Sequence, residues 1–153
     1  MTVTIAAPTK TAAVVFDLEG GLIDVSGIHH LAKDASRFHR ASLGCKANRD
    51  VVAAAQHARK NGKTVLVMTG GDRRLEQLVA TWLIRNGVPA SMLLMRCRGD
   101  FRPGAVVKRE RLRAAHRQFG SLTVWSADPS VNRLSERDGI DVVELPGYWG
   151  DTQ

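Results

Sequence analysis

Asp17 and Glu19 have the types and the spacing that suit chemistry, and they end an apolar run in the stretch AAVVFDLEGGLIDV. An unbroken apolar run before a carboxylate is typical of a strand that is buried on both faces. A carboxylate at the end of such a strand can attack phosphorus, and a second one can move protons. The same pattern also fits a strand that runs into a turn, because Gly20 and Gly21 come next.

Further polar groups follow apolar runs or begin a helical segment. Thr69 and Gly70 end the run KTVLVMTGG, Asp128 follows LTVWSA, and Lys108 lies in the first turn of GAVVKRERLRAAHRQFG. Polar residues that follow parallel strands meet at one edge of the sheet. A carboxylate, a hydroxyl, backbone amides and a lysine around one point suit phosphoryl chemistry, because the carboxylate attacks while the others hold the phosphoryl oxygens.

Alternating elements would position these groups. Apolar runs predict strands at 11–17, 63–71, 91–96, 122–127 and 140–145, and glycine-terminated periodic segments predict helices at 47–62, 72–87, 104–120 and 129–139. Asn48 is expected to cap the first of these helices. One face of the second is expected to be buried through Leu75, Leu78, Val79, Trp82 and Leu83. This order predicts an α/β fold, a three-layer doubly wound sandwich around a central five-stranded parallel sheet.

The length of 153 residues fits one domain, which we assign to residues 12–149, with tails at 1–11 and 150–153. Residues 26–46 interrupt the alternation of strands and helices, and we interpret them as a small helical cap insertion around LAKDASRFHRAS. The spacing of the histidines in this insertion favours surface or packing positions over a metal site; they are His29, His30 and His39.

Composition narrows the class of protein. Apolar residues make up 44% and charged residues 24%, as in ordinary globular proteins. No apolar run is long enough to span a membrane and the start lacks a secretory signal, so we expect a cytoplasmic protein without a membrane partner. Cys45 and Cys97 are expected to be ordinary reduced thiols. The net charge of +7 favours an acidic partner, with nucleic acid as the first candidate.

The densest basic segment runs from Arg96 to Arg117 and adjoins the expected pocket. Two interpretations stay open: a track that leads a nucleic-acid backbone toward the pocket, and a solvated helix face. Phe101 is the nearest aromatic residue, so base-specific recognition is not expected. The candidate nucleic-acid contacts in this segment are Arg96, Arg98, Arg102 and Arg109.

Taken in order, these motifs resemble those of the haloacid dehalogenase superfamily of phosphohydrolases. VVFDLEGGLID resembles the first motif, Asp-x-Asp-Gly-Thr, VLVMTGG resembles the second, and the lysine of VVKRE matches the third. More specifically, TWLIRNGVPASMLLMRCRGDFRPGAVVKRERL is similar to the phosphatase domain of bacteriophage-type polynucleotide kinases. The resemblance covers nearly the whole chain and implies the same doubly wound fold with a small cap.

The resemblance also implies residue roles. By position, Asp17 falls on the aspartyl nucleophile and Glu19 on the general acid–base residue. The groups that would hold the phosphoryl oxygens are Thr69, Gly70 and Lys108. The superfamily's magnesium ion is implied as cofactor, with Asp17 and Asp128 as candidate ligands. The implied substrate is a phosphate monoester, and a DNA or RNA end, a nucleotide and a sugar phosphate all stay open.

The chain departs from the family pattern around the expected site. The departures are Glu19 for aspartate, Gly21 for threonine, Gly71 for arginine, Gly104 for aspartate, and Ser126 and Ala127 for the paired aspartates of the fourth motif. Fewer carboxylates predict weak magnesium binding. A longer acid–base side chain predicts slow turnover, because ~1 Å of misplacement can cost about a hundredfold in rate. Two functions stay open: a slow phosphomonoesterase, and a catalytically inactive protein that binds nucleic acid or phosphorylated ligands.

Overall fold

Strands and helices alternate along the chain in the computed structural model, which describes residues 2–3 and 10–147. The strands are β1 (Ala12–Asp17), β2 (Thr64–Asp72), β3 (Met92–Arg96), β4 (Ser121–Ser126) and β5 (Asp141–Glu144). The helices are α1 (Ala35–Ser42), α2 (Arg49–Lys60), α3 (Glu76–Arg85), α4 (Gly104–Gln118) and α5 (Pro129–Arg137), with short 3-10 helices η1 (Ser26–Leu31) and η2 (Arg73–Leu75). The predicted 150–153 tail, most of the 1–11 tail, and residues 148–149 lie outside the described residues.

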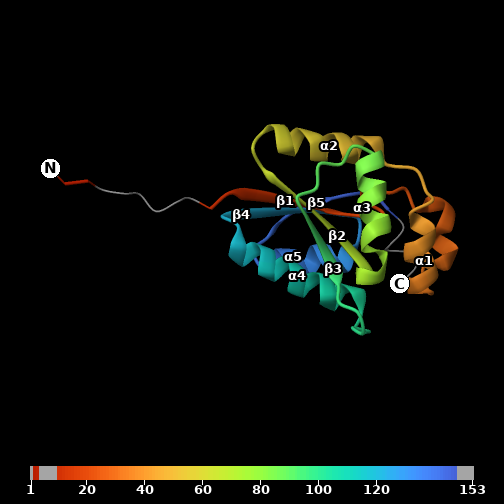
Figure 1. The fold of residues 1–153 in the computed structure, drawn as a ribbon. Coiled ribbons are helices and arrows are strands. Elements are labelled where there is room, and N and C mark those ends of the chain that lie inside the picture. The colour runs from red at the N-terminus through yellow and green to blue at the C-terminus, as the bar shows by residue number, and fades with distance from the viewer. Residues whose placement is uncertain (1, 4–9, 148–153) are drawn as a thin grey trace.

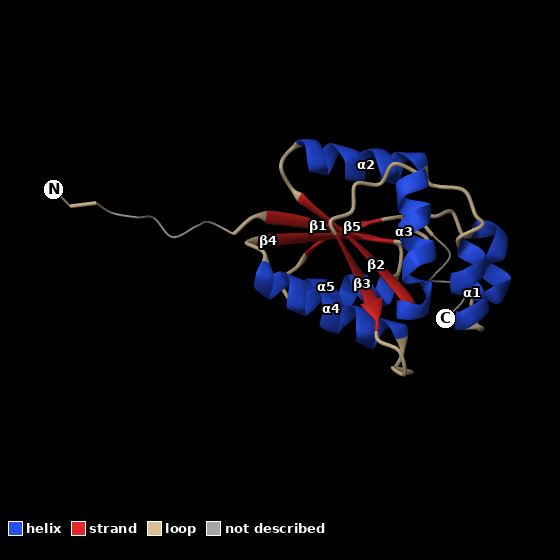
Figure 2. Cartoon of the chain, viewed as in Figure 1, coloured by secondary structure: helices blue, strands red, loops and turns tan. Residues whose placement is uncertain are grey.

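The strands form one parallel sheet in the order β3-β2-β1-β4-β5, which confirms the predicted α/β fold (Figure 2). The chain moves outward from β1 through β2 to β3, then crosses back to place β4 and β5 on the other side of β1. β1 is therefore the central strand, and the direction of winding changes beside it. In open α/β sheets this switch point, at the carboxyl ends of the strands, is where ligands bind.

Helices cover both faces of the sheet, with α2 and α3 on one side and α4 and α5 on the other (Figure 1). The alternation of side chains along β1 explains both layers. Val14 and Phe16 pack into a cluster with Trp82 of α3. Ala13 and Val15 pack into a second cluster, which includes Leu112, Ala115 and Val131 from α4 and α5. β1 thus has no solvent-facing side, as its unbroken apolar run predicts.

Residues 26–46 contain η1 and α1, which lie beyond the sheet at the edge where β1 ends (Figure 1). Asp34 caps α1, since its Oδ1 accepts a hydrogen bond from the backbone N–H of Arg37 at 3.2 Å. Phe38 is buried and joins the cluster under α2 and α3. The insertion is therefore packed against the edge that should hold a ligand.

Two local expectations were wrong. Leu78 is 48% exposed, because the buried stripe of α3 is centred on Val79 and Leu83 and Leu78 lies at its edge. Asn48 occupies the N-cap position of α2, but its side chain makes no capping bond. Its Nδ2 instead donates to the carbonyl of Gly21 at 2.7 Å, which ties the start of α2 to the turn after β1.

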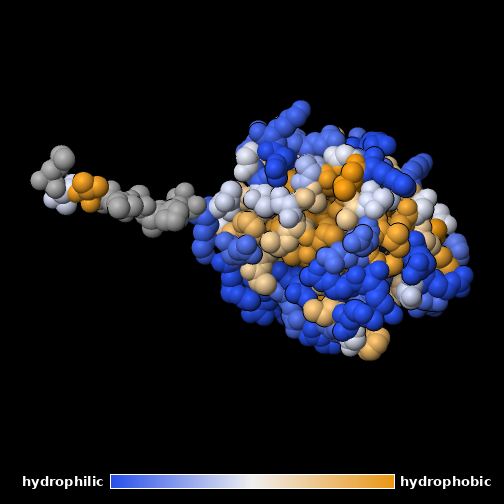
Figure 3. Space-filling view, viewed as in Figure 1, coloured by the Kyte–Doolittle hydropathy of each residue, from blue (hydrophilic) through white to orange (hydrophobic). Residues whose placement is uncertain are grey.

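Hydrophilic side chains cover much of the face shown in Figure 3, and an apolar area lies across its middle, near α3 and β3. Exposed apolar side chains on these two elements include Leu78, Ile84 and Met92. Within the described ranges, no helix has the length and apolar composition needed to cross a membrane. Cys45 and Cys97 are both free thiols, as expected.

The turn after β1 depends on a glycine. The N–H of Leu22 donates to the carbonyl of Asp17 at 3.0 Å, and that of Ile23 donates to Leu18 at 2.9 Å, so the chain folds back tightly. A Cβ on Gly21 would lie 2.1 Å from the carbonyl oxygen of Asp17, which is far inside contact distance. A side chain at this position requires the backbone beside Asp17 to move.

We expect Gly21→Ala to destabilise the protein by ~3 kcal/mol or more, because the clash is with backbone and not with a flexible side chain. Gly27→Ala is the matched control, since a Cβ there meets nothing within 4 Å, and it should change stability by less than ~1 kcal/mol. Urea unfolding of both variants provides the measurement, and equal midpoints would contradict the close packing of this turn.

Candidate active site

The polar side chains that follow the central strands meet at one edge of the sheet. Asp17 at the end of β1, Thr69 in β2 and Ser126 at the end of β4 are all nearly inaccessible to solvent, as is Lys108 from the first turns of α4. Asp17 and Lys108 are 91 residues apart in sequence, yet Asp17 Oδ1 lies 2.9 Å from Lys108 Nζ. The structure therefore brings the expected carboxylate and ammonium together.

Both oxygens of Asp17 accept hydrogen bonds. Oδ1 accepts from the ammonium of Lys108, and Oδ2 accepts from the hydroxyl of Ser126 at 2.8 Å. Ser126 Oγ in turn accepts from the backbone N–H of Asp128 at 3.1 Å. At a position where the resemblance places an aspartate, this chain thus has a neutral hydroxyl that donates to Asp17.

Burial and charge set the protonation of this pair. Burial raises the pKa of the Asp17 carboxyl, and the negative charge of Glu19 adds to that rise while Lys108 opposes it. Burial lowers the pKa of Lys108, but the carboxylates of Asp17 and Glu19 outweigh it and raise that pKa above its usual value. Lys108 is therefore a charged ammonium at neutral pH and is suited to holding an anion.

Glu19 is held by both the sheet and the insertion. Its Oε1 accepts from the hydroxyl of Thr69 at 2.6 Å and lies 2.9 Å from Nδ1 of His39 in α1. Burial would raise the pKa of Glu19, but the charge and hydrogen bond of His39, with Lys108 and Thr69, lower it to about 2. Glu19 is therefore ionised at neutral pH. Its Oε2 is buried without a hydrogen-bond partner among the described residues.

His39 is a site residue that sequence analysis missed. It was expected at a surface or packing position, and the structure adds a contact between its imidazole and the carboxylate of Glu19. The only local signal is the glycine pair that follows Thr69. A Cβ on Gly70 would lie 3.1 Å from His39 Cε1 and 3.9 Å from Lys108 Cε, so the absence of a side chain there admits the ring.

The donor set does not fit the magnesium ion that the resemblance implies. An ammonium and a hydroxyl already bond to the two oxygens of Asp17. Asp128, the other predicted ligand, caps α5 by accepting the N–H of Ser130 at 2.9 Å. Across residues 2–3 and 10–147, no group of three or more His, Cys, Asp or Glu side chains is placed to hold a metal ion.

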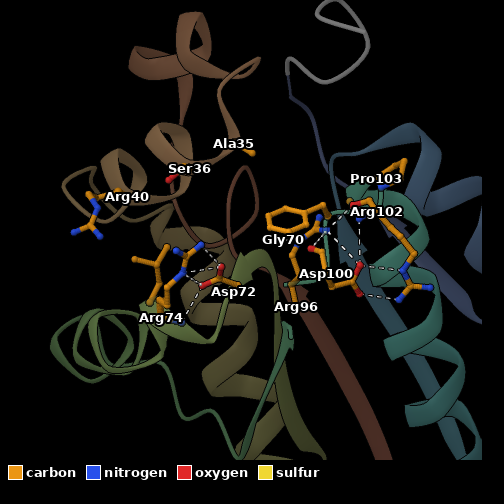
Figure 4. A pocket seen from close by; sticks show the side chains of 13 residues that line it. Ala35, Ser36, Arg40, Gly70, Asp72, Arg74, Arg96, Asp100, Arg102 and Pro103 are labelled. Carbon is orange, nitrogen blue, oxygen red and sulfur yellow. Dashed lines mark hydrogen bonds and ion pairs between the residues drawn. The ribbon is translucent and has the colours of Figure 1, made fainter. Parts of the chain in front are cut away.

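A cleft of about 400 Å³ lies beside these residues, and Gly70, the neighbour of Thr69, is part of its lining. Figure 4 shows Ser36 and Arg40 of the insertion on one wall, and Arg102 and Pro103 of the loop before α4 on the other. Gly70 lines the cleft and also lies against His39 and Lys108, so it connects the open cleft to the buried groups.

The four arginines that were predicted to contact nucleic acid differ in the groups that surround them. Arg96 donates to the carbonyls of Gly70, Asp100 and Arg102 and so holds the loop that forms one wall of the cleft. Acidic side chains pair with the guanidinium groups of two other candidates: Asp100 and Glu110 with Arg102, and Asp138 with Arg109. Arg98 is exposed. Their contact with nucleic acid stays a prediction.

Two further arginines, Arg40 and Arg74, line the cleft but were not among the predicted contacts. Arg74 pairs with Asp72 at 2.7 Å, whereas Arg40 is exposed on α1. Both lie outside the dense basic segment, so the sequence offered no reason to group them with it. On the insertion's side of the cleft, Arg40 therefore contributes one positive charge.

The low pKa of Glu19 predicts acid sensitivity. Folding lowers the pKa of Glu19 from its ordinary value of 4.5 to about 2. The stability that ionised Glu19 adds to the folded protein is therefore complete above pH 4.5 and is lost as the pH falls toward 2. Between those values, wild-type unfolding free energy should fall more steeply than that of Glu19→Gln, by up to ~1.4 kcal/mol per pH unit. Urea unfolding at stepped pH measures this, with exposed Glu76→Gln as control; parallel curves for wild type and Glu19→Gln would contradict it.

Several solved structures share this fold. A chain of the Pnkp1/Rnl/Hen1 complex is 17% identical, with 97% of this chain and 51% of that one covered and a TM-score of 0.74. A chain of the Pnkp1/Rnl/Hen1 RNA repair complex is 19% identical, with 95% and 45% covered and a TM-score of 0.75. This chain thus spans about half the length of those chains.

A third similar structure is the class C acid phosphatase from Bacillus anthracis with tungstate bound. It is 13% identical, with 93% of this chain and 69% of that chain covered, and a TM-score of 0.67. At such identities these likenesses concern the fold. No curated protein matches the chain.

The family assignment depends on sequence. Residues 11–122 match the family model of the polynucleotide kinase PNKP phosphatase domain, which covers well over half of the chain. The matched range runs from the start of β1 into β4 and includes Asp17, Glu19, Thr69 and Lys108. This chain therefore belongs to the polynucleotide kinase phosphatase-domain family within the haloacid dehalogenase superfamily.

Proposed function

We propose that this chain is a slow phosphomonoesterase that removes the phosphate from a 3′ end of DNA or RNA. The buried contact between Asp17 Oδ1 and Lys108 Nζ carries the proposal, because it places a nucleophile beside the cation that its phosphoryl substrate needs. The family match supports phosphoryl chemistry. The choice of a nucleic-acid end is supported by the basic cleft and by the likeness to chains of an RNA repair complex.

The chemistry would proceed in two steps. The Asp17 carboxylate attacks phosphorus, the bond from phosphorus to the leaving oxygen breaks, the leaving oxygen takes a proton from water, and an aspartyl phosphate forms. Before this attack, Lys108 must release Asp17 Oδ1 and move to the phosphoryl oxygens, which it holds together with the hydroxyl of Thr69 and the N–H groups near Gly70. In the second step water attacks the aspartyl phosphate and gives a proton to Glu19, which restores Asp17 and releases phosphate.

The protonation of Glu19 supports slow turnover. Because its pKa lies near 2, Glu19 can accept a proton from water in the second step. The first step, however, needs a proton for the leaving oxygen, and an ionised carboxylate does not carry one.

The neutral hydroxyl of Ser126, in place of an acidic group, reduces the attraction of the site for magnesium.

The first test is phosphate release from a 3′-phosphorylated oligonucleotide, with and without magnesium. Wild type should release phosphate, and Asp17→Asn should lower the rate at least ~100-fold, because the amide is a poor nucleophile. Magnesium should raise the rate only weakly. The unphosphorylated oligonucleotide is the substrate control, and equal rates for wild type and Asp17→Asn would exclude the enzyme.

A second candidate function is phosphate binding without turnover, which one observation favours. Both oxygens of Asp17 are already bonded to Lys108 and Ser126, so the carboxylate is held and not free to attack. The phosphate-release experiment distinguishes the two functions. The binder should retain a 3′-phosphorylated oligonucleotide on Lys108, release no phosphate, and show no response to magnesium.

The second test concerns the insertion's wall of the cleft. Arg40→Ala should weaken oligonucleotide binding by about 0.5 to 1 kcal/mol and reduce the slope of log affinity against log salt by ~1, because one phosphate contact is lost. Arg37→Ala is the matched control, since Arg37 is exposed on the same helix and does not line the cleft. Salt titrations that give equal slopes for the two variants would remove Arg40 from the binding surface.

A further inference from the structure

His39 connects the insertion to the buried acid of the site. Its Nδ1 lies 2.9 Å from Glu19 Oε1, although the two residues belong to different elements. The Thr69 hydroxyl donates to the same oxygen from β2 at 2.6 Å. Glu19 Oε1 is therefore held between the sheet and the insertion, and the orientation of this carboxylate depends on α1 being in place.

The ring of His39 fits a space that Gly70 leaves open. A Cβ on Gly70 would lie 3.1 Å from His39 Cε1 and 3.2 Å from Nε2, closer than side chains usually approach. A Cβ on Gly71 would lie 3.6 Å from His39 Cγ. Position 71 is also where the chain departs from the arginine of its subgroup. The imidazole thus takes up room beside Thr69 that a side chain on β2 would restrict.

The helix that carries His39 is held firmly. Ser42 is fully buried and its Oγ donates to the carbonyl of His39 at 2.7 Å. Phe38, the preceding residue, is 3% exposed in the core under α2 and α3. Asp17 itself is 1% exposed, and its hydrogen-bond partners, Lys108 and Ser126, come from α4 and β4.

We propose that His39 is a positioning residue that orients Glu19 and keeps the insertion docked over the active site. The orienting role rests on the proposed function, since it requires Glu19 to move protons during turnover. The docking role does not, because it concerns a contact between two parts of the fold. The two roles can therefore be tested separately.

The kinetic test compares His39→Leu, which fills the space without a donor, with His39→Asn, whose amide can still donate near the Nδ1 position. On a 3′-phosphorylated oligonucleotide, His39→Leu should lower kcat at least ~10-fold with little change in KM, because Glu19 loses its orientation. His39→Asn should recover most of that loss. Equal kcat for wild type and His39→Leu, or equal losses in the two variants, would overturn the orienting role.

The structural test is amide hydrogen exchange in residues 35–43, which needs no turnover. His39→Leu should speed exchange there by about tenfold, as expected for the loss of one charge-assisted hydrogen bond. His39→Asn should stay near wild type, and His30→Gln, exposed in the same insertion, should not differ from it. Unchanged exchange in His39→Leu would overturn the docking role. If wild type releases no phosphate, the proposed function fails and the exchange result alone decides the role of His39.

Discussion

The buried ion pair between Lys108 and Asp17 determines how the layers of this protein meet at the site. Lys108 comes from α4 on one face of the sheet, and Asp17 ends its central strand. Removing two charges from water costs several kcal/mol per ion, so such a pair persists only with good geometry and further hydrogen bonds. Ser126 supplies one of these from β4. The same contact therefore anchors α4 to the sheet and keeps an ammonium beside a carboxylate.

The charge around this pair governs which ligands the site favours. Two carboxylates, Asp17 and Glu19, face the ammonium of Lys108 and the imidazole of His39. A hydroxyl at position 126 adds no negative charge, so the site repels an anion less than one with further carboxylates would. The same substitution weakens its attraction for a hard divalent cation, which prefers carboxylate oxygens. The balance of charge at this site is consistent with the phosphorylated substrate that we propose.

The insertion completes the site that the sheet begins. α1 provides His39 on the inner side and Arg40 on the wall of the cleft, from neighbouring positions in the helix. The glycines after Thr69 allow this close approach, because a Cβ on Gly70 would press against the imidazole. One short helix thus contacts both the buried carboxylate of Glu19 and the open cleft. The contact of His39 with Glu19 is the link between α1 and the buried carboxylates on which our proposal for this helix rests.

The sequence by itself determined the order of strands and helices, because apolar periodicity and glycine stops are local properties. It also predicted that Asp17 and Thr69 lie together, since polar groups near the carboxyl ends of parallel strands converge, and the resemblance added support for Lys108 from the helix. Only the tertiary structure decided that His39 meets Glu19 and that Asn48 bonds to Gly21 instead of capping its helix. Such contacts depend on how an insertion or a turn packs against backbone that is distant in sequence. A local sequence pattern does not specify which distant residues will meet.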